Sequence, residues 1–384
     1  MSSRSNKNTS VFLDGHIDRS TWKRVRLGDV LSYEQPYSYI IKNEEYADVG
    51  IPVLTPGKTF ILGYTHETDG VCQASRQAPK ILFDDFLTIS RLIEFDFKVK
   101  SSAVKILSPT SDEYNIRYLF YAISQLRFDV VDHQRHWIGQ FSKLGITVPT
   151  REVQDKIATA IVSCENHIAA LEALITKYEA IKKATVNLLL EPHKSIPVVK
   201  LGEVADISRG GSPRPIQAYL TSDSNGINWI KIGDVSVDAK YIERTEERIK
   251  PTGVAMSRQV KAGDFILSNS MSFGRPYILK IDGCIHDGWL AIQNYQNTFE
   301  VDYLYYLLGS DMVFAQYLEN AAGSSVKNLN KDIVAKISLP SPPLSEQRRI
   351  AKRITTIDEF LIDCKRQLNK AQQLKQGMMA YFFG

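Results

Sequence analysis

The chain repeats one pattern twice, and each copy ends in a long helix that carries a heptad stripe. The first copy approaches its helix through Ile146-Thr147-Val148-Pro149, and the second through Ile337-Ser338-Leu339-Pro340. Apolar residues then recur at steps of four and three, and the second stripe follows the first at a constant offset of 193 residues. This spacing predicts two helices that pack together. The stripes are Ile157, Ile161, Cys164, Ile168, Leu171, Ile175 and Tyr178, then Ile350, Ile354, Ile357, Leu361, Cys364, Leu368 and Ala371.

The segments before the two helices also repeat in the same order, so the repeat unit is a whole domain together with its helix. The echoes are Arg26–Val30 with Lys200–Val204, Gly50–Leu54 with Gly226–Ile230, Asp84–Ser90 with Gly263–Ser268, and Tyr118–Ile123 with Tyr303–Leu308. The first twenty or so residues are rich in Ser, Asn and Thr, which is typical of disorder. We predict a disordered tail at 1–20, domains at 21–151 and 193–344, and spacer helices at 152–192 and 345–384.

Connectivity predicts how the helices run. Each spans about 39 residues, or ~58 Å at 1.5 Å per residue, without an internal proline. The first leaves domain one and reaches domain two through the short linker Pro192–Val199, so the second can pair with it only by running back. The helices should therefore be antiparallel and relate the two copies by a pseudo-twofold. The alternative, in which each helix only caps its own domain, is disfavoured because the stripes extend too far.

The domains themselves show the pattern of a mostly β core. Short β-branched and aromatic runs, such as Ile51–Leu54, Lys80–Phe83 and Phe265–Leu267, alternate with Gly, Pro, Asn and Asp turns. One helix is expected in each domain, near Asn115–Asp129 and Val301–Glu319. The predicted fold class is α+β: two mostly-β globular domains joined by two long antiparallel coiled-coil helices.

Composition indicates a soluble cytoplasmic protein. No continuous run approaches the ~18 apolar residues that span a membrane, and no apolar core segment follows Met1–Asn8 as in a signal peptide. Cys164 and Cys364 lie on the heptad stripes, where cysteine behaves as a small apolar residue. Cys72 and Cys284 stand far apart, so neither a disulfide framework nor a zinc site is expected.

The approach to the second helix resembles a known family. The segments Gly323–Asn330 and Ile337–Ala351, the latter reading ISLPSPPLSEQRRIA, are similar to those of the specificity subunit of Type I restriction-modification systems. The order of domain and heptad helix, repeated once, matches the same family over nearly the whole chain beyond residue 20. The first copy departs from the motif, because Pro149–Gln154 is two residues shorter and lacks the Pro-Pro pair.

The resemblance implies a non-catalytic protein that reads DNA. Each domain would be a target-recognition domain for one half of a split sequence, and the helices would set the gap between the halves. The implied partners are double-stranded DNA, two methyltransferase subunits and, in restricting complexes, two restriction subunits. S-adenosylmethionine, ATP and magnesium would be bound by those partner subunits, and no cofactor by this chain. Half-site centres ~34–36 Å apart fit within the helix length.

Charge placement narrows the DNA-contacting candidates. The net charge is only +4, and the excess lies on the second helix, with eight Lys/Arg against four Asp/Glu, whereas the first has four against five. Arginine can fork onto guanine, and Asn or Gln onto adenine. Polar or basic stretches precede each helix, and Arg209–Pro215 forms a basic loop. The candidates are Lys58, Arg76, Gln77, Arg91, Gln134, Arg135, His136 and Lys143 in the first domain, and Arg209, Arg214, Asn269, Ser270, Arg275, Lys327 and Asn328 in the second.

Two enzymatic alternatives rest on weaker patterns. Asp84 and Asp85, followed by Asp96 and Lys98, have the outline of a magnesium-dependent nuclease, but the second copy has no equivalent and ordinary strand charges explain them as well. The segment Ser341–Leu344 superficially resembles an amino-methyltransferase loop, but Leu344 cannot stack on a flipped base.

Two further alternatives concern metal binding and protein bridging. His133 and His136 lack a carboxylate or cysteine at ligand spacing, so no metal site is predicted. A coiled-coil adaptor that bridges two proteins without reading DNA is the structural alternative.

Overall fold

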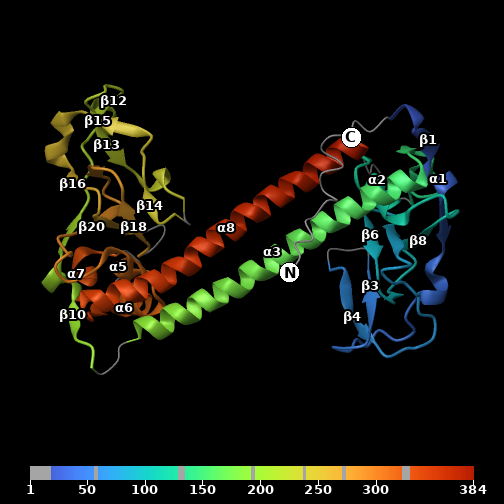
Figure 1. Ribbon diagram of the computed structural model, residues 1–384, viewed down its shortest axis with the longest axis horizontal. Helices are drawn as coiled ribbons and strands as arrows, with labels where there is room; N and C mark the ends of the chain where they lie inside the picture. The colour runs from blue at the N-terminus through green and yellow to red at the C-terminus, as the bar shows by residue number, and fades with distance from the viewer. Residues whose placement is uncertain are drawn as a thin grey trace, which may run out of the picture. The chain divides into compact units, whose positions relative to one another are not determined.

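The computed structural model describes residues 19–55, 59–128, 135–191, 195–236, 239–269, 274–321 and 329–384. The chain forms two compact units: unit 1 is the chain up to Glu172 together with Gln367–Gly384, and unit 2 is Ala173–Arg366. Two helices of 40 residues each, α3 (Arg151–Leu190) and α8 (Leu344–Phe383), contribute to both units (Figure 1). The expected pair of long helices is therefore present.

Unit 1 is built on two small sheets. The four-stranded sheet is antiparallel in the order β2-β8-β5-β6, and the three-stranded sheet has the order β4-β3-β7 with β3 parallel to β7. A further ribbon pairs β1 with β9, the strand that leads into α3. The strands are β1 (Lys23–Arg26), β2 (Leu31–Glu34), β3 (Ile51–Leu54), β4 (Ile61–Thr65), β5 (Lys80–Asp84), β6 (Ser90–Ile93), β7 (Lys98–Val99), β8 (Val104–Pro109) and β9 (Gly145–Val148).

Unit 2 repeats this plan with additional strands. Its sheets have the orders β11-β20-β17-β18-β14 and β12-β15-β13-β19-β16, and the ribbon β10-β21 leads into α8. The strands are β10 (Val198–Lys200), β11 (Asp206–Arg209), β12 (Leu220–Thr221), β13 (Ile227–Ile230), β14 (Tyr241–Ile242), β15 (Glu247–Ile249), β16 (Arg258–Val260), β17 (Phe265–Ser268), β18 (Pro276–Leu279), β19 (Gly283–Ile285), β20 (Trp289–Gln293) and β21 (Ser338–Pro340).

The sheet orders show which segments are equivalent. The short helices α1 (Leu27–Val30) and α4 (Leu201–Val204) follow the same ribbon strand in each unit, and β3 and β13 each pair in parallel with one strand, as the echoes predicted. One predicted echo, that of Asp84–Ser90 with Gly263–Ser268, is wrong. The last residue of β5, Asp84, faces Val104, as Ser268 at the end of β17 faces Trp289. Asp84 thus corresponds to Ser268, because the register of the paired strands, and not sequence similarity, determines which residues of the two units are equivalent.

The helices of the domains differ in part from the predictions. α2 (Ile116–Ser124) begins where Asn115 accepts from the backbone amides of Arg117 and Tyr118, and it is shorter than expected. The long helix expected in the second domain divides into α5 (Val301–Leu308) and α6 (Asp311–Ala321). Gly309 disfavours continuation, and the Ser310 hydroxyl accepts from the Val313 amide at 3.3 Å to begin the next helix. α7 (Lys331–Lys336), which was not predicted, begins at Asn330.

The heptad stripes do two things. Ten of the fourteen stripe residues are buried, and Ile168, Tyr178, Ile357 and Leu368 are partly buried. The first turns of each stripe pack into a domain core: Ile157 and Ile161 in unit 1, and Ile350 and Ile354 in unit 2. Each helix therefore covers its own domain at its start and pairs with the other helix farther along.

Pairing of the two helices is antiparallel within each unit. In unit 1, Ile157 and Ile161 share a core cluster with the C-terminal turns of α8, and the Cys164 thiol donates farther along to the Ala371 carbonyl at 3.4 Å. In unit 2, Glu179 pairs with Lys365 at 2.7 Å and Lys182 with Asp358 at 2.6 Å. Rising positions on α3 thus meet falling positions on α8, which confirms the predicted direction. The pseudo-twofold concerns relative placement of the units and stays a prediction.

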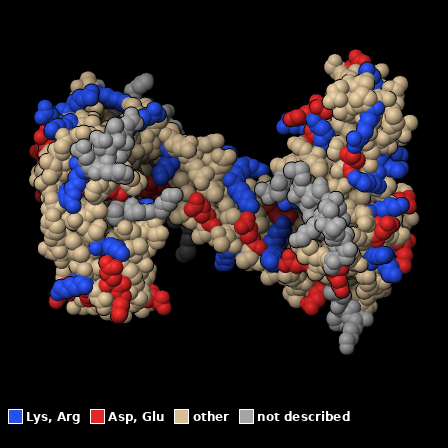
Figure 2. All heavy atoms as spheres, turned by 180° about the vertical axis from the view of Figure 1, so that it is seen from behind, with Lys and Arg blue, Asp and Glu red and all other residues tan. Residues whose placement is uncertain are grey.

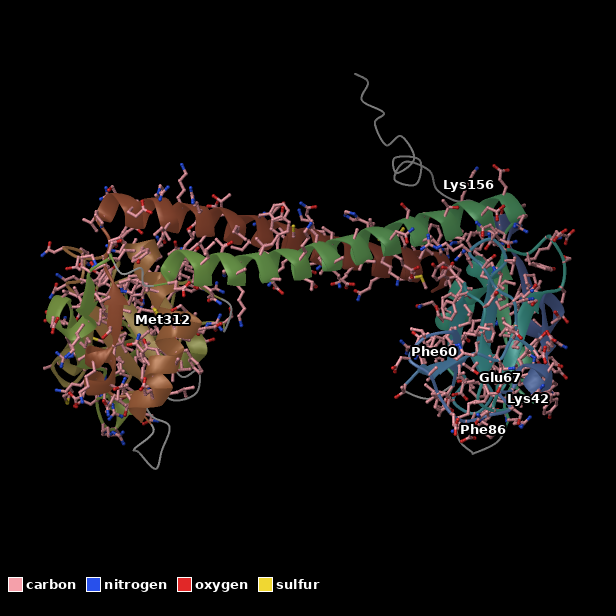
Figure 3. All side chains as sticks on the ribbon, turned by 90° about the horizontal axis from the view of Figure 1, so that it is seen from below. Lys42, Phe60, Glu67, Phe86, Lys156 and Met312 are labelled. Carbon is pink, nitrogen blue, oxygen red and sulfur yellow. The ribbon has the colours of Figure 1, made fainter. Side chains whose placement is uncertain are left out.

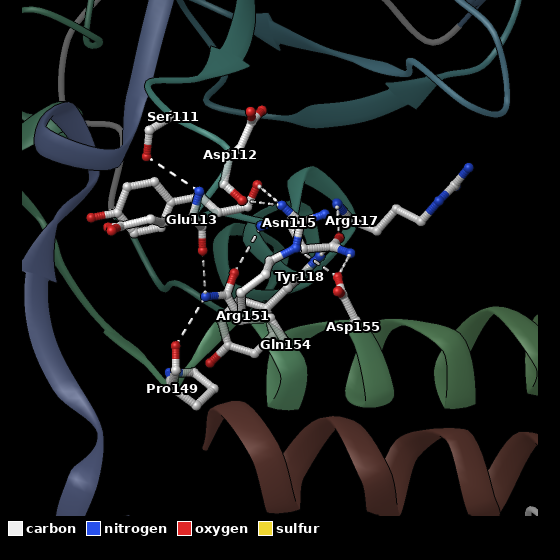
Figure 4. A network of polar contacts seen from close by, with 11 residues as sticks. Ser111, Asp112, Glu113, Asn115, Arg117, Tyr118, Pro149, Arg151, Gln154 and Asp155 are labelled. Atoms are coloured by element: carbon white, nitrogen blue, oxygen red, sulfur yellow. Dashed lines mark hydrogen bonds and ion pairs between the residues drawn. The ribbon is translucent and has the colours of Figure 1, made fainter.

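A buried glutamine fixes each domain to the start of its helix, and Figure 4 shows the contacts of Gln154 in unit 1. Gln154, 1% exposed, donates to the carbonyls of Pro149 at 2.9 Å and Glu113 at 3.1 Å and accepts from the Asn115 amide at 2.8 Å. Gln347, fully buried, makes the equivalent contacts in unit 2, to the carbonyls of Pro342 and Thr298 and from the Glu300 amide. Two copies with different sequences around the glutamine therefore retain the same three hydrogen bonds.

A second contact repeats where domain and helix pair meet. The Tyr121 hydroxyl donates to Glu165 at 2.6 Å, and Lys375 pairs with Glu165 at 2.8 Å. In unit 2, Tyr306 donates to Asp358 at 2.7 Å, and Lys182 pairs with the same carboxylate. Burial raises the pKa of both tyrosines, so each phenol stays protonated and remains a donor. In each unit one carboxylate thus links the domain, its exit helix and the opposite helix.

By length and composition alone, α3 could cross a membrane, since one 18-residue window has a mean hydropathy of 1.2. The sequence has no continuous apolar run of that length, and charged residues interrupt the helix. Its apolar face packs against the domains and α8, and Glu165 and Lys182 form ion pairs with α8. Packing against the domains and α8 therefore accounts for the buried apolar residues of α3.

Candidate nucleic-acid interface

Three loops meet at the same place in each unit. In unit 1, the Asp85 amide donates to the Ala103 carbonyl at 3.0 Å, and the His136 amide donates to the Asp85 carbonyl at 2.8 Å. In unit 2, the Asn269 amide donates to Gly288 at 3.1 Å, and the Leu329 amide donates to Asn269 at 2.9 Å. The position before Ala103 is Ser102, and the position before Gly288 is Asp287, so these two residues are equivalent.

In unit 2 this junction gathers predicted DNA contacts around Asp287. Ser212 donates to its Oδ1 at 3.1 Å, and the Arg214 guanidinium lies 3.4 Å from its Oδ2. The Arg209 Nε donates to the Asp287 carbonyl at 3.2 Å, and the Asn269 amide group donates to the same oxygen at 3.0 Å. The structure thus brings Arg209, Arg214 and Asn269 together.

The members of this cluster differ in what they can offer to DNA. Arg209 and Arg214 are exposed, and the Arg214 side chain is 81% exposed. Asn269 is buried, so it holds the loop instead of presenting an amide to adenine as predicted. Arg275 is partly buried, and its carbonyl accepts from the Ser268 amide at 3.3 Å. The two arginines are therefore the strongest candidates in unit 2.

In unit 1 the equivalent junction carries two predicted contacts, His136 and Arg135, and Arg135 remains a candidate. It is exposed, donates to the Ser102 hydroxyl at 3.1 Å and lies 6.0 Å above the Phe86 ring. Phe86 lies on the opposite side of unit 1 from Lys156 of α3 (Figure 3). His136, predicted as a contact, is instead buried with its ring against Phe128. Its backbone is equivalent to that of Leu329 in unit 2, whose side chain is also buried, and this position explains why the His136 ring is not exposed.

The other predicted residues of unit 1 are more dispersed. Lys143 is exposed on the short helix Phe141–Lys143. Arg76 and Gln77 are exposed, and Arg76 lies 3.9 Å from Glu94. Arg91 is partly buried with its guanidinium 4.5 Å above the Phe60 ring. The predictions for Lys58, Gln134, Ser270, Lys327 and Asn328 fall outside the described residues.

Charge on the surface is mixed. On the face drawn in Figure 2, the described Lys and Arg side chains lie among Asp and Glu side chains over both units. DNA specificity would then depend on individual side chains more than on a basic face.

The residues of the nuclease alternative have separate structural tasks. The Asp84 carboxylate accepts from the amides of Phe86 and Leu87, and Asp85 pairs with buried Lys105 at 3.2 Å. Lys98, also buried, pairs with Glu67 at 3.0 Å. The Asn43 amide and this ammonium lower the pKa of Glu67 to about 2.

Asp96 accepts from the Ala74 amide at 3.0 Å. Within the described ranges, no group of three His, Cys, Asp or Glu residues is placed to hold a metal ion. These carboxylates and the lysine therefore stabilise turns and strands.

The sequence did not indicate that Ser102 and Asp287 hold the exposed arginines at the two loop junctions. An acidic residue is an unattractive candidate for DNA binding, and Ser102 follows no recognisable motif. The available signal was the alignment of β8 with β20, since each residue lies two positions before its strand. That alignment depends on strand register.

Comparison with known proteins agrees with this architecture. The profile of the type I restriction modification DNA specificity domain matches residues 19–183 and again 194–376. The chain therefore belongs to this family, and it contains the domain twice. It is 29% identical to the type I restriction enzyme EcoR124I/EcoR124II specificity subunit of Escherichia coli, over 97% of this chain and 95% of that protein.

Two solved structures share the fold. One is the S subunit of a type I restriction-modification system from M. genitalium, with a TM-score of 0.66 and 15% identity, covering 96% of this chain and 98% of the other. The second, from work on complex assembly and conformational transition of the type I restriction-modification system, has a TM-score of 0.55 and 17% identity, with 96% and 99% coverage. The fold class predicted from the sequence is confirmed.

Proposed function

We propose that this chain is the specificity subunit of a type I restriction-modification complex and that each unit reads one half of a split DNA site. The observation that carries the proposal is the duplication of a DNA specificity domain, with each copy joined to its helix by the same buried contacts. The exposed arginines at the two loop junctions, Arg135 in unit 1 and Arg214 in unit 2, come from different loops and have different partners, Ser102 and Asp287, which suits two different half-sites.

The spacer role of the helices rests on their continuity. Each is an unbroken helix of 40 residues, or ~60 Å at 1.5 Å per residue. An antiparallel pair with buried stripes is stiffer than a single helix, which suits an element that sets a distance between half-sites.

The partners belong to the proposal as well. Two methyltransferase subunits and, in a restricting complex, two restriction subunits would assemble on the chain in the cytoplasm. S-adenosylmethionine, ATP and magnesium would be bound by those subunits. The chain itself would not be catalytic, and it would act by selecting the DNA.

The decisive experiment maps modified adenines across the genome of cells with and without this gene. We expect one split motif that is modified only when the gene is present. In a parallel binding assay, the purified chain with its methyltransferase partners should prefer that duplex over one with either half scrambled. Modification that persists after deletion, or equal affinity for every duplex, would contradict the proposal and favour a coiled-coil adaptor.

A further inference from the structure

The carboxylate of Asp287 is held from several sides in unit 2. Ser212 donates to Oδ1 at 3.1 Å, and the His286 Nε2 lies 2.9 Å from the same oxygen. His286 accepts from the Gly288 amide through Nδ1 at 2.9 Å, which holds the imidazole beside Asp287. Oδ2 faces the Arg214 guanidinium at 3.4 Å. Each carboxylate oxygen therefore has a polar side chain beside it.

This arrangement restrains one end of an exposed arginine. The Arg214 side chain is 81% exposed and that of Asp287 is 30% exposed. Among contacts between described residues, only Nη2 of the guanidinium has a side-chain partner. The second Nη2 proton and the Nη1 or Nε proton beside it remain able to form a two-donor fork for a ligand, while the pair with Asp287 limits rotation. A preorganised donor fork loses less conformational entropy on binding than a free arginine.

The choice of ligand follows from the charges. A phosphate carries a full negative charge, and a carboxylate beside the guanidinium weakens the attraction for it. Guanine offers two uncharged acceptors, O6 and N7, at the spacing of two guanidinium donors. A phosphate contact also requires no fixed orientation, whereas a base contact does. The geometry therefore favours a base edge over the DNA backbone.

We propose that Arg214 reads a guanine in one half-site and that Asp287 is the positioning residue that orients it. The inference rests on the proposed function and deepens it by naming the base and the residue pair. Asp287 is assigned the positioning role, and not a base contact, because Ser212 and Arg214 contact its two oxygens.

Unit 1 supplies an internal contrast at the position equivalent to Asp287, where the neighbouring arginine comes from a different loop. There Ser102 replaces Asp287, and it holds Arg135 by one hydrogen bond to a neutral hydroxyl at 3.1 Å. A neutral partner neither restrains the guanidinium by charge nor reduces its attraction for phosphate. Arg135 should therefore show a larger backbone component in its binding to DNA than Arg214.

The test uses the complete complex of this chain with its methyltransferase subunits. Binding is measured on a panel of duplexes in which each base pair of the mapped site is replaced in turn. The variants are Arg214→Ala, Asp287→Asn and the double variant. Arg244→Ala, which removes another exposed arginine of unit 2, is the matched control. Melting temperature and affinity for unrelated DNA show that Asp287→Asn, which keeps the shape of the side chain, remains folded.

We expect Arg214→Ala to reduce discrimination at a single G·C pair by roughly 5- to 150-fold, the range of one bidentate contact, and to leave the other positions unchanged. Asp287→Asn should reduce discrimination at the same pair by a smaller factor. The double variant should be no worse than Arg214→Ala alone, because the aspartate acts through the arginine. Arg244→Ala should alter no position.

Three results would overturn the inference. Uniform weakening on every duplex in Arg214→Ala would mark a phosphate contact. An unchanged base preference in Asp287→Asn would remove the positioning role. Loss at a different base pair in Asp287→Asn would mean that the aspartate reads a base itself. In each case the wild-type complex still selects a split site, so the proposed function survives; a wild-type complex without sequence preference would instead refute that function.

Discussion

The buried glutamine at each helix start allows a quantitative prediction. Replacing Gln347 with alanine removes three hydrogen bonds of 2.8–2.9 Å from a side chain that has no solvent exposure. At ~1 kcal/mol net for each bond, unit 2 should lose ~3 kcal/mol. The Glu300 amide and the two carbonyls then stay buried without a hydrogen-bond partner, which adds to the cost. The value of ~3 kcal/mol is therefore a lower estimate of the loss.

Hydrogen exchange measured by mass spectrometry resolves this loss unit by unit. In Gln347→Ala, peptides that contain the Glu300 amide should exchange faster, with opening free energy reduced by ~3 kcal/mol. Peptides around Asn115 in unit 1 serve as an internal reference and should respond only to Gln154→Ala.

Gln372→Ala, an exposed glutamine on the same helix, should change stability by less than ~0.5 kcal/mol. Equal exchange in Gln347→Ala and Gln372→Ala would show that the glutamine does not fix the domain to its helix.

Other perturbations test the helix junctions and the spacer. Tyr306→Phe removes a bond to a carboxylate and should cost about 2 kcal/mol in urea unfolding, whereas exposed Tyr37→Phe should be neutral. Burial raises the pKa of Tyr305 to about 12, above the ordinary ~10. The contribution of protonated Tyr305 to the free energy of unfolding should therefore be fully present below pH ~10 and fall as the pH rises towards 12, because the unfolded chain releases the proton first. Unfolding midpoints measured between pH ~8 and ~12, together with tyrosinate absorbance, check this expectation. Deleting one heptad from both helices, 168–174 and 361–367, should shorten the mapped gap by about three base pairs, and an unchanged gap would count against the spacer role.

The sequence predicted the elements that obey periodicity. The heptad stripes predicted both long helices, because burial of one face requires a regular spacing, and chain connectivity predicted their direction. The apolar run Ile51–Leu54 is a strand, as predicted, and its echo contains the equivalent strand Ile227–Ile230. The division of the expected helix at Gly309 and Ser310 was not predicted, although both residues are ordinary signals for a helix end and a new start.

The interface was less predictable because it is made by convergence. His136 reads as a polar loop residue, yet its backbone lies at the position of Leu329 and its ring is buried. Asn269 likewise appears free in sequence but donates its amide inside the loop junction. Asp287 gains its role only because separate segments bring Ser212 and Arg214 to it. No local pattern encodes such a meeting.

A comparison of the two units separates what is shared from what differs. At the helix junctions the same atoms meet in both: a glutamine on the same two carbonyls and one amide, and a tyrosine on a carboxylate paired with a lysine of the opposite helix. At the loop junction the equivalent positions differ in chemistry, since Ser102 of unit 1 corresponds to Asp287 of unit 2. Contacts that hold a domain on its helix face the same geometric demand twice, so they are retained. The loop contacts proposed to face DNA are free to differ, and a duplicated scaffold with different loop residues would suit a split site whose halves are not the same sequence.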